Sequence, residues 1–219
     1  MGRVRISVAV VAALAVLAVQ PAPARADTFD NTFFPHHWGP NPYVTLPPAN
    51  LFYRSVYVID NTGDPALSRH IQRFTEIINY VHVVYNPNYP VLLYYKDFHL
   101  APGNPCADGP AQFLVVCKDE TPAGGGPTTP GTASIATQFA SHIFNANASF
   151  RPSVVDPWCD ADKLTLVVQL LSNTLGLDDN LTNPASSQFP TIPVGRCTAN
   201  GWTAAEFDRM NQSYSHAVG

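Results

Sequence analysis

The most constraining feature of this chain is a stretch from Asp160 to Leu175 that is apolar on most sides of a helix. Its apolar residues recur at three- and four-residue spacing: Leu164, Val167, Val168, Leu171 and Leu175, widened by Leu166 and Leu170. A helix with so wide an apolar surface is stable only when other elements cover it. Gly176 follows at the place where a left-handed residue ends a helix. We therefore expect a domain built around a buried helix.

Short runs of β-branched and aromatic residues precede this helix and predict strands at 52–59, 91–95, 113–116 and 143–150. A helix is expected from about Pro65 to Tyr80, where apolar residues have helical spacing. A last helix is expected to start at Thr203, which forms a capping box with Glu206. Strands first, a buried helix late and a closing helix predict an α+β domain.

The first 26 residues are typical of a secretory signal peptide. Arg3 and Arg5 precede an apolar run from Ile6 to Val19, and Ala24-Arg25-Ala26 forms an A-x-A cleavage site. The run is shorter than the roughly 20 residues that span a bilayer. We expect a secreted mature chain of residues 27–219, folded as one domain, with no membrane segment after cleavage.

The mature chain is acidic, which argues against nucleic acid or anionic lipid as its main partner. Its four cysteines all follow the cleavage site, and an even number of cysteines in an exported chain predicts two disulfides. Three pairings are possible in principle. We favour Cys106 with Cys117 and Cys159 with Cys197, because the first two bracket a short loop. No C-x-x-C motif occurs, so a thiolate metal site is not expected.

Residues 169–180, QLLSNTLGLDDN, resemble the zinc-binding signature H-E-x-x-H-x-x-G-x-x-H of the metzincin peptidases in its matrixin form. The helical run, Gly176 and the Leu177-Asp178 pair carry the likeness. Three further segments are similar to family features: 187–191 to the Met-turn segment, 203–214 to the closing helix, and 57–78 to the first strand and first long helix. The resemblance implies a twisted, mostly parallel sheet of about five strands. A long N-terminal helix, a central buried helix at about 160–175 and a C-terminal helix pack with it.

The chain departs from the signature at every position that carries chemistry. The three zinc-ligand positions hold Gln169, Asn173 and Asp179, the general-base position holds Leu170, and Gln188 replaces the Met-turn methionine. In the family, imidazoles bind zinc and a Glu takes a proton from the zinc-bound water. Amide oxygens bind zinc weakly and Leu170 cannot move a proton. We therefore expect no catalytic residue, no bound metal and no cofactor. Zinc is expected only under the alternative in which non-standard ligands form a metal site.

Other candidate groups are weaker. His142, near the strand that in the family runs beside the substrate, is the best substitute ligand to join Asp179, and His36-His37 is a second candidate for metal capture. Gln169 and Asn173 can equally be a hydrogen-bonded polar stripe on a buried helix. No G-x-S-x-G motif points to a serine nucleophile, and neither Ser141 nor Ser172 has a base nearby in sequence.

The expected function is that of a secreted, catalytically inactive matrixin-like domain. Such a pseudoenzyme would act by binding an extended peptide or an exported protein, for instance along the edge of its sheet. Two alternatives stay open. One is an active peptidase that uses zinc or another metal with non-standard ligands. The other is a secreted structural or interaction domain unrelated to peptidases.

Overall fold

The computed structural model describes residues 27–30, 32–33, 36–39, 54–84, 91–96, 106–138, 142–192 and 194–214. These residues form an α+β domain whose sheet is mostly parallel, which confirms the expected fold class. The strands are β1 (His37–Trp38), β2 (Arg54–Asn61), β3 (Val91–Lys96), β4 (Phe113–Lys118), β5 (Gly131–Gln138) and β6 (His142–Phe150). The helices are α2 (Pro65–Val84), α3 (Pro152–Val155), α4 (Asp160–Thr174) and α5 (Ala204–Tyr214).

The sheet has the order β1-β6-β4-β2-β3, with all of these neighbours parallel. β5 pairs with the other side of β6 and runs antiparallel to it, from Gly131 opposite Phe150 to Gln138 opposite His142. An irregularity between Ala136 and Thr137 shifts this register by one residue. The antiparallel strand therefore lies beside β6 at one border of an otherwise parallel sheet.

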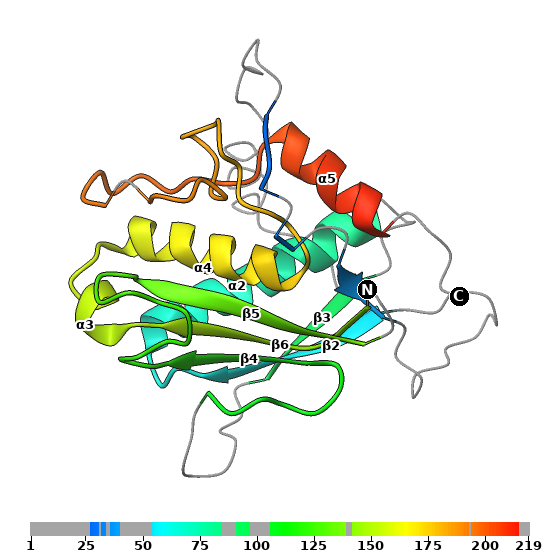
Figure 1. Cartoon of the computed structure of the whole chain (residues 1–219), viewed down its shortest axis with the longest axis horizontal. Coiled ribbons are helices and arrows are strands. Elements are labelled where there is room, and N and C mark those ends of the chain that lie inside the picture. Colours follow the sequence, from blue (N-terminus) through cyan, green and yellow to red (C-terminus); the bar gives the residue numbers. More distant parts are fainter. Residues whose placement is uncertain are drawn as a thin grey trace, which may run out of the picture.

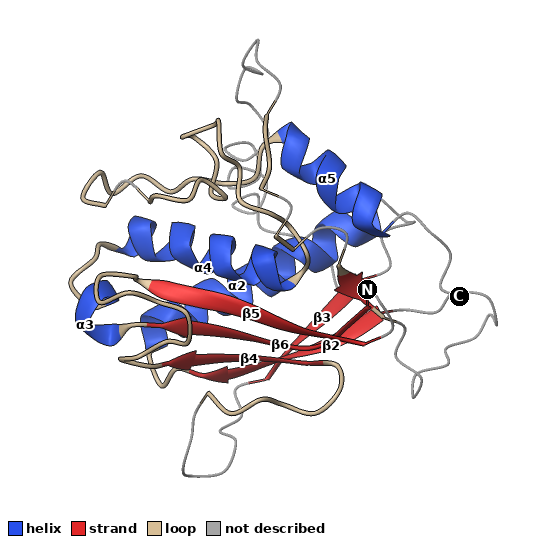
Figure 2. Cartoon of the chain, in the orientation of Figure 1, coloured by secondary structure: helices blue, strands red, loops and turns tan. Residues whose placement is uncertain are grey.

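Helices α2 and α4 pack against each other and cover one face of the sheet (Figure 1). Alternate residues of the central strands point toward them and are fully buried, including Val58, Leu114 and Ala148. α4 lies over β5 and β6, and α2 lies over β3 and β2. The loops between α4 and α5 run along the side of α4 that faces away from the sheet (Figure 2). α4 is thus enclosed on both sides, as its apolar pattern requires.

Most of the expected elements are present with small shifts at their ends. The expected helix 65–80 is α2, which continues to Val84, and the expected helix 160–175 ends one residue earlier, at Thr174. The capping box is present: Thr203 Oγ1 accepts from the Glu206 N–H at 3.4 Å, and Glu206 Oε2 accepts from the Thr203 N–H at 2.6 Å. The sequence did not predict β1, β5 or the short α3. The described sheet consequently has six strands rather than about five.

Two disulfides join the four cysteines in the expected pairing. Cys106 is bonded to Cys117 at the outer face of β4, and Cys159 is bonded to Cys197 beside the start of α4. Their Cα atoms are 5.3 Å and 5.8 Å apart, within the usual range for a disulfide. Among the described helices, none is long and apolar enough to cross a membrane.

Candidate functional site

The last turn of α4 and the loop after it bring the three positions that match zinc ligands to one place. Gly176, at φ +90°, ends the helix, and the N–H groups of Gly176 and Leu177 donate to carbonyls of the last turn. The chain then turns back, so that Asp179 lies next to Asn173, with 3.4 Å between Asp179 Oδ1 and the Asn173 amide. Gly176 has no room for a side chain, because a Cβ there would lie 1.8 Å from the carbonyl oxygen of His36.

The amide groups at this place bond to one another and to the backbone. Gln169 Nε2 donates to the carbonyl of Phe189 at 3.1 Å. The Asn173 amide is best satisfied when its Nδ2 donates to Gln188 Oε1 at 2.7 Å, the Gln169 carbonyl at 3.1 Å and the Leu177 carbonyl at 3.0 Å. In the opposite orientation Nδ2 donates to Asp179 Oδ1 alone, at 3.4 Å. We name these four residues, Gln169, Asn173, Asp179 and Gln188, the amide cluster.

The carboxyl group of Asp179 is the one ionisable member of the amide cluster. Burial raises the pKa of Asp179, hydrogen bonds from Asn173 and Gln169 lower it, and the negative charges of Asp30 and Asp178 raise it. When Asn173 is turned toward Gln188, its amide no longer donates to Asp179, so the lowering of the pKa by Asn173 is lost. The pKa of Asp179 therefore lies above its usual range.

Leu170 fills the position of the catalytic Glu in the signature and belongs to the hydrophobic core. Its side chain is 5 % exposed. Its Cδ1 lies against Gly131 at the start of β5, so closely that a Cβ on that glycine would be 2.7 Å away. No proton acceptor stands at this position.

The donor set of the amide cluster does not fit zinc. It offers neutral amide groups and one buried carboxyl, whereas protein zinc sites use imidazole, thiolate and carboxylate ligands. The amides of Gln169 and Asn173 are already used in hydrogen bonds, and both side chains are only 7 % exposed. Ser172 is no nucleophile either, because its hydroxyl is buried between the Val168 carbonyl at 2.5 Å and the Trp202 indole N–H at 2.7 Å. Ser141 lies outside the described residues.

The candidate histidines lie at β1 and at the start of β6. His142 starts β6, directly opposite His37 of β1, and the two rings meet edge to face with centroids 4.9 Å apart. His36 lies over Gly176 through its backbone carbonyl. Within the described part of the chain, the one group of three metal-binding side chains is Cys159, Asp162 and Cys197, so His142 and Asp179 share no such group.

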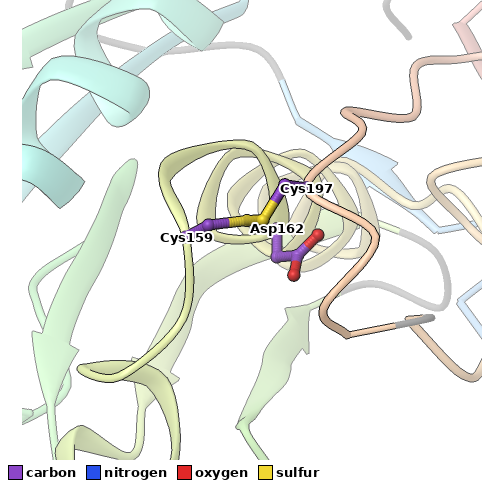
Figure 3. Close-up of side chains that lie close together, drawn as sticks. All are labelled: Cys159, Asp162 and Cys197. Atoms are coloured by element: carbon purple, nitrogen blue, oxygen red, sulfur yellow. A yellow bond between two sulfur atoms is a disulfide. The ribbon is translucent and has the colours of Figure 1, made fainter.

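The side chains of Cys159, Asp162 and Cys197 already take part in structural bonds (Figure 3). The two sulfur atoms form the disulfide, and the carboxylate of Asp162 accepts the backbone N–H of Gly195 at 2.7 Å. Bonded sulfur atoms are not thiolates and do not bind metal as thiolates do. The group therefore fastens the loop around Cys197 to the first turn of α4.

The described N-terminal residues 28–30 and 33 also reach this region, a contact that the sequence did not predict. Phe29 bridges Asn180, the Asp30 N–H donates to the Asp179 carbonyl at 3.3 Å, and the Phe33 N–H donates to Asp178 Oδ1 at 2.6 Å. Arg209 of α5 pairs with the same Asp178 at 2.8 Å. Residues about 150 positions apart carry no local signal of such pairing.

Comparison with known proteins adds no relative. No protein-family model matches the chain. None of the curated proteins matches it either. The geometry of the amide cluster is therefore the basis for its functional interpretation.

Proposed function

We propose that this chain is a secreted, matrixin-like domain that has lost peptidase chemistry and acts by binding. The observation that carries the proposal is the convergence of Gln169, Asn173 and Asp179 at the end of α4, with Gln188 beside them. The signature requires these positions to meet, although they span eleven residues and a glycine turn. The convergence of the three positions supports the resemblance to matrixins. Their amide and carboxyl side chains support the proposal that zinc binding has been lost. Burial of Leu170 supports the loss of the general base.

The partner that fits this domain best is an extended peptide or a segment of an exported protein. β5 pairs with β6 on one side and has no strand on its other side within the described residues. Its middle residues Ser134, Ala136 and Thr137 are exposed, so backbone groups of this border can be reached. An unpaired strand edge binds an extended chain through backbone hydrogen bonds. α4 packs against β5, which places the amide cluster on the element next to this edge.

Metal analysis of purified residues 27–219 tests the loss of zinc chemistry. After loading with zinc and desalting, the protein should keep no stoichiometric metal and should not cleave an unfolded protein. The matched control is the triple variant Gln169→His/Asn173→His/Asp179→His. Because these positions converge, three imidazoles there should bind one zinc ion per chain.

The two samples separate the competing functions. One zinc ion per wild-type chain together with chelator-sensitive proteolysis would show an active peptidase with non-standard ligands. A folded triple variant that binds no zinc would show that the positions do not form a peptidase-like site. The chain would then be a structural or interaction domain without relation to peptidases.

A further inference from the structure

Arg151, directly after β6, is a buried arginine whose guanidinium group has no partner among the described residues. The residue is 6 % exposed. Its Nε is buried and has no hydrogen-bond partner. Nη1 and Nη2 form no hydrogen bond with the described residues either, but unlike Nε they are not buried. Because a guanidinium group keeps its charge at every pH at which proteins fold, this charge is left without a counterion in the described chain.

The main chain at Arg151 is held in place from both sides. Arg151 connects β6 to α3 at the end of the sheet where β5 begins (Figure 1). Its N–H donates to the Pro130 carbonyl at 2.8 Å, and its carbonyl accepts from the Val155 N–H at 2.9 Å. Phe150 before it and Val155 after it are fully buried. The guanidinium group therefore projects from a fixed backbone, which reduces the entropy that a ligand would have to remove on binding.

The carboxylates on the adjoining segments are bonded to other groups. Glu120 accepts from the Ser153 N–H at 3.0 Å and from the Ser153 hydroxyl at 2.5 Å. Asp156 pairs with Lys118 at 2.9 Å. No ion pair of the described residues includes Arg151. An unpaired buried charge destabilises a fold, whereas the same charge in a two-pronged contact with an anion is favoured.

We propose that Arg151 is the centre of a binding site for an oxyanion, the carboxylate or phosphate group of a ligand. Its Nε and one Nη present two parallel N–H donors, which match two oxygens of such a group. The Nη atoms give access from solvent, and Nε gains the hydrogen-bond partner that it lacks in the fold. Because the chain is acidic overall, the affinity comes from this direct contact and not from long-range attraction. The site does not depend on what the amide cluster or the edge of β5 binds.

Thermal unfolding of residues 27–219 at neutral pH, in sodium chloride, phosphate and acetate of equal ionic strength, tests this site. Phosphate or acetate at about ten times its Kd should raise the melting temperature by about 3–5 °C over chloride. Arg151→Met should lose this rise, and in chloride it should melt no lower than the wild type, because an apolar side chain replaces an unpaired buried charge. The matched control Arg196→Met, at an exposed arginine, should keep the rise. Phosphate also stabilises proteins by exclusion from their surface, but all three proteins share that effect.

A rise with acetate, with phosphate or with both, present in the wild type and absent from Arg151→Met, supports the site and identifies the oxyanion. Equal melting temperatures of the wild type in all three salts, or the same rise in Arg151→Met, would overturn the proposal. If Arg151→Met does not fold, the Nε–H resonance of Arg151 in the isotope-labelled wild type decides, assigned by its loss in Arg151→Lys. It should shift and saturate at one anion per chain as acetate or phosphate is added. A resonance that both anions leave in place contradicts the site.

Discussion

At the scale of single residues, Gly176 has the most demanding position in the described chain. It combines a positive φ with a backbone carbonyl, that of His36, where a side chain would have to start. Gly63 has a similar positive φ, but nothing lies within 4 Å of the Cβ that it lacks. A side chain at Gly63 would cause backbone strain alone, whereas a side chain at Gly176 would cause both backbone strain and a steric clash.

Gly176→Ala should lower the free energy of unfolding by about 3 kcal/mol or more, because strain and a clash with His36 add together. The control Gly63→Ala should cost only the strain of a left-handed residue, about 1–2 kcal/mol. Denaturant unfolding of both variants measures the difference. Similar losses in the two variants would mean that the N-terminal segment does not lie over Gly176.

The sequence predicted which residues occupy the site, but it did not predict how they are bonded. Helical spacing alone puts Gln169 and Asn173 on one face of α4, and Gly176 indicates a turn toward Asp179. The orientation of the Asn173 amide depends on Gln188, fifteen residues further along the chain, and the network around Glu206 depends on Asp27. Contacts between residues so far apart in the chain produce no periodic pattern that a single sequence could reveal.

At the scale of elements, Tyr214 joins three parts of the fold. Its hydroxyl donates to the Leu175 carbonyl at 2.7 Å and accepts from the Trp38 N–H of β1 at 3.2 Å. The Trp38 indole in turn donates to the Thr174 carbonyl at 2.9 Å. The end of α5 thereby fastens β1 to the end of α4, and the Trp38 and Tyr214 side chains are both fully or almost fully buried.

Tyr214→Phe should therefore destabilise the protein by about 2–4 kcal/mol, since two buried polar groups lose their partner. Tyr94→Phe is the matched control: Tyr94 is 39 % exposed, and its change should stay within about 0.5 kcal/mol. Equilibrium unfolding monitored by tryptophan fluorescence provides both values. A loss in Tyr214→Phe no larger than in the control would contradict the joining role of this hydroxyl.

Helices and strands were predicted well where their buried residues form a periodic apolar pattern in the sequence. Elements without such a pattern were missed. α2 and α4 carry apolar residues at helical spacing, and β2 and β4 are rich in valine and aromatic residues. The strand β5, GTASIATQ, consists mainly of small residues with one isoleucine, because it borders the sheet and packs against α4. Its residues have a low β-propensity, and apolar and polar side chains alternate only weakly along it. Pairing with β6 therefore stabilises this segment as a strand.

At the scale of the whole molecule, buried carboxyl groups make stability depend on pH. Burial raises the pKa of Asp179 and of Glu206 in the folded protein. A folded state that holds protons more tightly than the unfolded state loses stability as the pH rises from the unfolded pKa, near 4, through the folded pKa. The protein should therefore be more stable in mild acid than the ordinary behaviour of carboxylates suggests.

Asp179→Asn removes one of these groups and keeps its size. The variant should melt higher than the wild type at about pH 8, where the wild type holds a buried charge, and should show no gain at about pH 4. Melting curves across this range measure the effect. A variant that is less stable at both pH values would show that the ionised carboxylate stabilises the folded state.

The packing of Leu170 against Gly131 makes position 170 difficult to convert into a proton acceptor. A glutamate introduced by Leu170→Glu would be placed in the apolar interior, next to a strand that approaches too closely for any side chain at position 131. A carboxylate at position 170 would need compensating changes among the residues packed around it. The contact between helix and border strand thus acts as a ratchet on further sequence change, because position 170 can become polar only together with its neighbours.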